Sequence, residues 1–100
     1  MPILIAFHKS PRKGKKYVAV FANPKMTIHF GSDVSQTFTE GASQLKKENY
    51  IKRHKVREDW TKINAGSLSR YVLWSKPTLK GGLQEFMRIF NVKDNRKVRI

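Results

Sequence analysis

Residues 17–30 read YVAVFANPKMTIHF, and this stretch predicts two strands joined by a turn. The run from Tyr17 to Phe21 is rich in β-branched and aromatic residues, which is typical of a strand. Apolar and polar side chains alternate from Met26 to Phe30, so every second residue faces the same side of a sheet. The tripeptide Asn-Pro-Lys at 23–25 supplies the turn between the two strands. The segment therefore predicts an antiparallel pair with one apolar face.

A third strand is expected nearer the N-terminus. Residues 3–7 read ILIAF, a short apolar run, and residues 8–16 read HKSPRKGKK. The proline, glycine and charges of this second stretch are typical of an exposed loop. Together with the pair above, the run at 3–7 predicts an antiparallel meander with one face to cover.

Helical patterns dominate the rest of the chain. The segment from Ala42 to about Glu58 contains good helix formers and neither proline nor glycine. Asn64 is a candidate N-cap for a second helix. The buried stripe of that helix would carry Leu68, Tyr71 and Val72.

The third helix has the clearest pattern. Its apolar residues recur with a period close to 3.6 at Leu79, Leu83, Phe86, Met87 and Phe90. Thr78 or Ser75 could cap this helix. The adjacent Gly81 and Gly82 are unfavourable in a helix, so they indicate either close packing against a neighbour or a fraying first turn.

These patterns predict an α+β fold. We expect a small antiparallel β-meander of about three strands, followed by about three helices packed on one face. No linker or internal repeat divides residues 1–100, so the sequence predicts a single basic α+β domain.

Composition excludes several classes of protein. The chain has no cysteine, which excludes disulfide scaffolds, thiol catalysis and thiolate zinc sites. The longest apolar run, residues 3–7, is far shorter than the roughly 20 residues that a membrane span needs. Lysine and arginine number 21 against 7 acidic residues, a formal charge of +14, and such an excess predicts an anionic partner.

Catalytic, metal and cofactor signatures are not found in the sequence. His8, His29 and His54 have no spacing typical of a metal site, and no glycine-rich phosphate-binding motif occurs. His54 and Glu58 lie four residues apart and could pair on a helix, which we interpret as a structural ion pair. A hydrolase or nuclease that uses this pair stays open as an alternative. We expect no enzyme, no cofactor and no metal.

Two basic segments are the candidate sites for binding a polyanion or a partner protein. The first is the loop that carries Lys9, Arg12, Lys13, Lys15 and Lys16, and the second is the helical stretch with Lys52, Arg53, Lys55 and Arg57. Charge alone does not separate phosphate from carboxylate, and a loop that is only solvated is the simpler interpretation. Large aromatic residues are the candidate core or interface anchors: Tyr17, Trp60, Tyr71 and Trp74. Glu58 and Asp59 are expected to pair with Arg53, Arg57 or Arg70.

An ordered series of motifs resembles a known family. They are KYVAVF at 16–21, KMTIHFG at 25–31, YIKRHKVREDW at 50–60, AGSLSRYVLW at 65–74 and KPTL at 76–79. Together they resemble a small basic domain of unknown function found in large DNA viruses of algae and amoebae and in some phages. The resemblance implies a viral context and no enzymatic activity.

Residues and resemblance together predict a non-enzymatic virion structural protein, a minor capsid or cement component that binds acidic capsid proteins. The alternative is a protein that binds DNA or RNA and coats or condenses the viral genome. Residues 3–7 and 97–100 could be strands offered to neighbouring proteins. The expected location is the virion, and during assembly the host cytoplasm or a virus factory.

Overall fold

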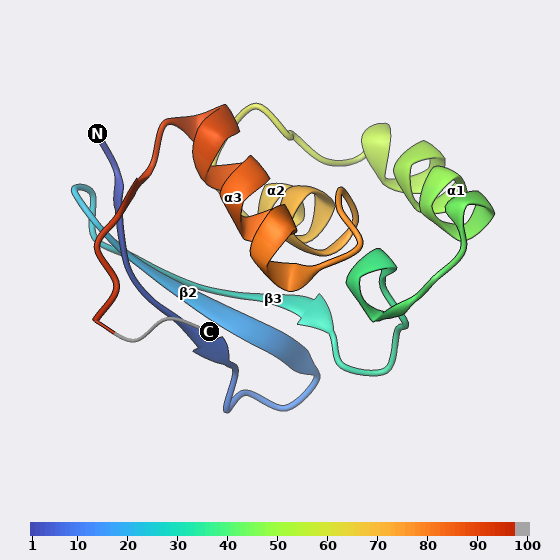
Figure 1. Cartoon of the computed structure of the whole chain (residues 1–100), viewed down its shortest axis with the longest axis horizontal. Helices are drawn as coiled ribbons and strands as arrows, with labels where there is room; N and C mark the ends of the chain where they lie inside the picture. The colour runs from blue at the N-terminus through green and yellow to red at the C-terminus, as the bar shows by residue number, and fades with distance from the viewer. Residues whose placement is uncertain (98–100) are drawn as a thin grey trace.

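Four strands form a mixed sheet in the order β3-β2-β1-β4 (Figure 1). The computed structural model describes residues 1–97. The meander consists of β1 (Ile3–Lys9), β2 (Lys15–Ala22) and β3 (Met26–Ser32), with antiparallel pairing throughout. The three strand predictions are therefore confirmed, with each strand two or three residues longer than its apolar run.

The alternation of side chains follows the predicted pattern. Phe21 and Phe30, on the same face of β2 and β3, are fully buried. Phe7, Tyr17 and Phe30 form an aromatic group across the three strands, with ring centroids 5.3 to 6.2 Å apart. These rings form one end of the core.

The fourth strand, β4 (Lys93–Asp94), runs parallel to β1. The Lys93 amide donates to the carbonyl of Pro2 at 3.0 Å, and the Asn95 amide donates to that of Leu4 at 2.9 Å. Because Ile3 and Leu4 have strand neighbours on both sides, the expectation that residues 3–7 form a free edge is wrong for these two. Of the expected strand at 97–100, all residues after Lys97 lie outside the described part of the chain.

The helices begin at side-chain caps. Ser43 caps α1 (Gln44–Lys55) by accepting from the Lys46 amide at 3.1 Å. The helix is shorter than the expected segment 42–58 at both ends. Asn64 caps α2 (Ala65–Leu68) by accepting from the Ser67 amide at 2.8 Å, which confirms the prediction. A wider turn, η2 (Ser69–Leu73), continues α2. A short 3₁₀ turn, η1 (Phe38–Glu40), precedes α1.

The third helix, α3 (Leu79–Phe90), begins at Thr78, whose hydroxyl accepts from the Gly81 amide at 3.0 Å. Leu83 and Phe86 of the apolar stripe are buried, and the Phe86 ring packs against Phe21 of the sheet. A Cβ atom on Gly82 would lie 2.0 Å from the carbonyl oxygen of Val72, so α3 and η2 are in direct backbone contact. This confirms close packing as the reason for Gly82.

The helices α2, η2 and α3 lie over the sheet, and α1 extends beyond the end of β3 (Figure 1). Their buried residues share a core with the strands, which includes Leu68, Val72, Leu73, Leu83 and Phe86. Sheet and helices make an α+β fold, as predicted. Among the described residues, no helix is both long and apolar enough to cross a membrane.

Candidate polyanion-binding cleft

A cleft of about 630 Å³ opens between the sheet and α1. One wall comes from the start of β2 and the end of β3, the other comes from α1, and the first turn of α2 lies between them. Serine and threonine residues at 32, 35, 37 and 69 add polar groups to the lining. The cleft is therefore a polar site built by segments that lie far apart in the sequence.

Among residues 1–97, three lysine or arginine side chains line the cleft. Lys15 comes from the first residue of β2, and Lys46 and Arg53 come from α1. Lys15 belongs to the predicted basic loop and Arg53 to the predicted basic helix, so the fold brings the two candidate segments to one site. Lys46 was missed by sequence reasoning, although its position seven residues before Arg53 places both on the same side of a helix.

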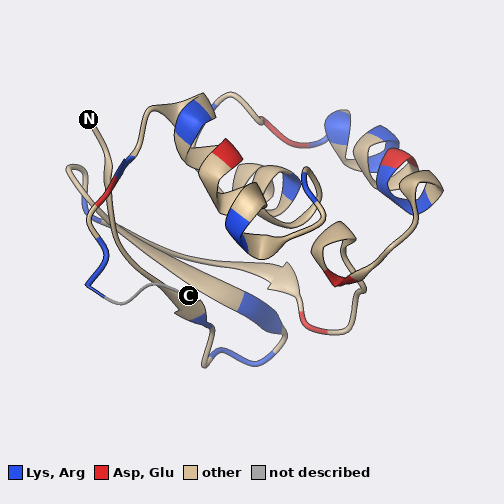
Figure 2. Ribbon diagram, in the orientation of Figure 1, with Lys and Arg blue, Asp and Glu red and all other residues tan. Residues whose placement is uncertain are grey.

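Most of the other candidate cations are exposed but do not line the cleft: Lys9, Arg12, Lys13, Lys52, Lys55 and Arg57. Figure 2 shows the basic positions of the β1–β2 loop and of α1 on either side of η1. The loop and the helix, which each supply cations to the cleft lining, therefore carry further positive charge on their exposed surfaces.

Lys16 differs from the other candidates because its charge is paired. Its Nζ lies 3.0 Å from Oε1 of Glu40, and only 10% of the lysine side chain is exposed. Burial opposes the ionisation of Glu40, but hydrogen bonds from Thr37 and Lys16 outweigh this effect and lower the pKa of the carboxyl group. The ion pair joins η1 to the sheet, so we assign Lys16 a structural role.

Glu58 is the carboxylate in the lining of the cleft, and its two oxygens have different partners. The Nδ1 atom of His54 lies 2.9 Å from Oε2, and the indole Nε1 of Trp60 donates to Oε1 at 2.8 Å. The spacing of four residues therefore predicted the His54–Glu58 contact. The expectation that Glu58 and Asp59 pair with arginines is wrong. Glu58 instead contacts a histidine and a tryptophan, and Asp59 accepts hydrogen bonds from Thr61.

Aromatic rings form a stack at the base of the α1 wall. His54 stacks on Tyr50 with centroids 4.2 Å apart, and Tyr50 stacks on Trp74 at 4.4 Å. Tyr50 and Trp74 are only 7% and 5% exposed. Burial raises the pKa of the Tyr50 hydroxyl, so this group stays neutral. The stack therefore supports the cleft wall and leaves little ring surface for a ligand.

The predicted aromatic anchors have different surroundings. Trp74 is in the core, as expected. The half-buried rings of Trp60 and Tyr71 lie 5.4 and 5.1 Å from the guanidinium carbon of Arg70. Tyr17 is half-buried against Phe7. These four residues stabilise the fold through packing and cation–π contacts.

The described lining of the cleft combines an excess of positive charge with polar groups. This lining carries three positive side chains, Lys15, Lys46 and Arg53, and one carboxylate. That carboxylate, Glu58, already has two hydrogen-bond partners. Among residues 1–97, no group of three or more side chains has the composition of a metal site. The arrangement favours a ligand that carries several negative charges.

Comparison with known proteins places the chain in a family. No curated protein and no solved structure matches it. A family model described as "Family of unknown function (DUF5754)" matches residues 5–54, which is half of the chain. The matched segment covers most of the meander and nearly all of α1, and it includes Lys15, Lys46 and Arg53 of the cleft. The chain therefore belongs to the DUF5754 family of unknown function.

Proposed function

We propose that this chain is a non-enzymatic structural protein, a minor capsid or cement component of a virus particle, whose basic cleft binds acidic segments of neighbouring proteins. The observation that carries the proposal is the convergence of Lys15, Lys46 and Arg53, from two separate segments, on one polar cleft. Such a cleft attracts carboxylate-rich surfaces and fixes their orientation.

Two features favour an acidic protein over a single-stranded nucleic acid. Proteins that bind single strands stack bases on exposed aromatic rings, whereas the rings of Tyr50 and Trp74 at this cleft are buried. The basic loop contains mostly lysine, which acts as a point charge and lacks the planar fork that suits phosphate. Both features fit carboxylates as the ligand groups.

The viral context rests on the resemblance of the five sequence motifs to domains of large DNA viruses. We assign the His54–Glu58–Trp60 contacts a structural role, because they join the last turn of α1 to the segment that follows it. A binding protein without catalysis accounts for the cleft, the charge and these contacts together.

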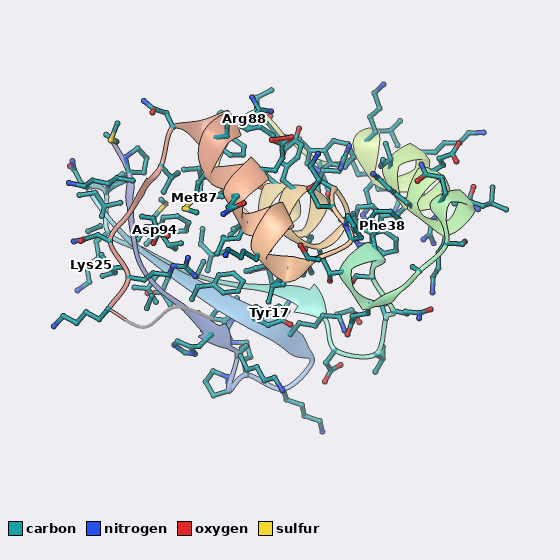
Figure 3. The ribbon with its side chains drawn as sticks, in the orientation of Figure 1. Tyr17, Lys25, Phe38, Met87, Arg88 and Asp94 are labelled. Atoms are coloured by element: carbon teal, nitrogen blue, oxygen red, sulfur yellow. The ribbon has the colours of Figure 1, made fainter. Side chains whose placement is uncertain are left out.

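The first test measures binding of the full chain to a peptide of about twelve residues rich in glutamate and aspartate, beside a single-stranded DNA of equal charge. The variant Lys15→Glu/Arg53→Glu reverses two charges in the cleft. The matched control, Lys25→Glu/Lys93→Glu, makes the same change in net charge at exposed positions outside the cleft lining. Figure 3 shows Lys25 at the opposite end of the molecule from α1.

We expect the cleft variant to bind the acidic peptide at least about tenfold more weakly, and the control to lose less than about threefold. Equal losses in both variants would show that only net charge matters and would refute the cleft. Cross-linking mass spectrometry on purified virus particles tests the structural role, and absence of the protein from particles would exclude it.

Binding of nucleic acid is the second candidate function. The observation in its favour is that the β1–β2 loop and α1, which both supply cations to the cleft, also carry exposed basic positions (Figure 2). A strand that contacts about six phosphates would lose roughly three orders of magnitude in affinity between about 50 and 200 mM salt. Tighter binding of DNA than of the acidic peptide, with this salt dependence, would favour the second candidate over the first.

A further inference from the structure

A second pocket lies on α3, away from the basic cleft. It has a volume of about 370 Å³ and lies between α3 and the C-terminal residues Asp94 and Arg96. None of its lining residues belongs to the cleft or to the segment matched by the family model. An inference about this pocket is therefore independent of the proposed function.

The α3 side of the pocket is apolar. Leu79, Leu83 and Met87 succeed one another at intervals of four residues and form a ridge along the helix. Figure 3 shows Met87 and Asp94 approaching each other from α3 and the C-terminal segment. This ridge provides a surface for an aliphatic chain.

The opposite side contains a buried guanidinium group. Only 8% of the Arg96 side chain is exposed. Its Nε and Nη2 donate to the two oxygens of Asp94 at 2.9 and 2.8 Å. Its Nη1 is buried and has no hydrogen-bond partner among residues 1–97. A buried charged donor without an acceptor is costly, so the wall of the pocket has an unmet requirement for an acceptor.

We propose that this pocket binds a small aliphatic carboxylate. Its alkyl chain lies along Leu79, Leu83 and Met87. A small rotation of the guanidinium on binding brings the buried Nη1 of Arg96 to the pocket surface, where it donates a hydrogen bond to the carboxylate. An arginine can bind two carboxylates at once, one along the edge already used by Asp94 and another at the remaining donor. The ammonium group of exposed Lys80 adds positive charge to the same pocket. Pocket volume and lining match those of small-molecule sites, which are mostly apolar with a few polar groups.

The charge balance selects a carboxylate over other head groups. Among the described residues that line the pocket, Asp94 pairs with Arg96, and Lys80 adds a second positive group. An alkyl ammonium would meet Lys80 and would supply no acceptor to Nη1. An alkyl alcohol would supply the acceptor but no charge.

The experiment titrates octanoate, octylamine and octanol into the full chain and follows the backbone amides by NMR. We expect octanoate to shift amides within residues 79–87 and 94–96, and to bind at least about tenfold more tightly than octylamine. This comparison uses the wild-type chain, so it does not depend on whether a variant folds. Equal binding of octanoate and octylamine, or shifts confined to other regions, would overturn the proposal.

Two variants refine the test. Arg96→Gln removes the charged donor and should weaken octanoate at least about tenfold, once circular dichroism shows that the variant is folded. Arg88→Gln is the matched control, because it makes the same substitution at an exposed position of α3 that does not line this pocket. Unchanged octanoate binding by folded Arg96→Gln would refute the role of Arg96. Binding of a leucine-terminated peptide more tightly than octanoate would refute the assignment to a small molecule.

Discussion

Replacement of Gly82 by alanine tests the packing of the helices on each other. In the native chain, the position of an added Cβ lies 2.0 Å from the carbonyl oxygen of Val72 and 3.1 Å from that of Tyr71. Real Cβ atoms almost never approach a neighbour closer than 3.0 Å, so α3 would have to withdraw from η2 by about 1 Å. Both contacts are with backbone, which a change of rotamer cannot relieve.

The magnitude follows from two opposing effects. Alanine is favoured over glycine in a helix by about 1 kcal/mol. Overpacking costs about 1 to 3 kcal/mol, and a gap of about 1 Å along the interface removes up to half of each dispersion contact there. Because the clash is with rigid backbone, we place the cost near the upper end. The expected net loss is about 2 kcal/mol, which lowers the melting temperature of a domain of this size by roughly 10 °C.

Thermal unfolding followed by circular dichroism measures this loss. Gly81→Ala is the matched control, because its Cβ would meet only side chains, Thr78 at 2.9 Å and Lys76 at 3.3 Å. We expect its helix-propensity gain and the disturbance of the Thr78 cap to cancel within about 1 kcal/mol. A melting temperature for Gly82→Ala equal to or above that of the native chain would refute the backbone contact between α3 and η2.

Three further substitutions test other parts of the fold. Asn64→Ala removes the cap of α2 and should destabilise the chain by about 1 kcal/mol in chemical denaturation, with Asn49→Ala on the exposed side of α1 as a control. Phe86→Ala should cost about 3 to 5 kcal/mol, since this fully buried ring contacts Phe21 and Phe90, and an unchanged denaturation midpoint would contradict its place in the core. Glu40→Gln should lower stability at neutral pH. The lowered pKa of Glu40 means that its contribution is complete above the ordinary value of 4.5 and is lost as pH falls through the lowered pKa, so native and variant stabilities should converge in acid. A difference that stays constant down to low pH would exclude Glu40 as its source.

Local signals predicted the elements of this fold well. The alternation at Met26 to Phe30 and the apolar period of α3 each reflect one buried face, which the sequence records directly. The caps at Asn64 and Thr78 were also predictable, because their side chains bind amides only three residues away. The strand β4 was not, since two residues that pair with a strand about 90 positions earlier leave no periodic pattern.

The cleft was predictable only in its parts. The sequence separates Lys15 from Arg53 by 38 positions, and nothing local indicates that both line the same cavity. The same limit explains Lys16, whose partner Glu40 is 24 residues away. By contrast, the contact between His54 and Glu58 was predictable, because the two residues are only four positions apart.

The position of the covering helices has a consequence for the segment that the family model matches. The matched segment 5–54 contains Phe21 and Phe30, yet Leu68, Val72 and Phe86, with which these rings share a core, all come later in the chain. A fragment restricted to the matched residues would expose these aromatic side chains to water and would aggregate. The segment matched by the family model is therefore smaller than the unit that folds, and stable expression of the domain requires the residues after 54 as well.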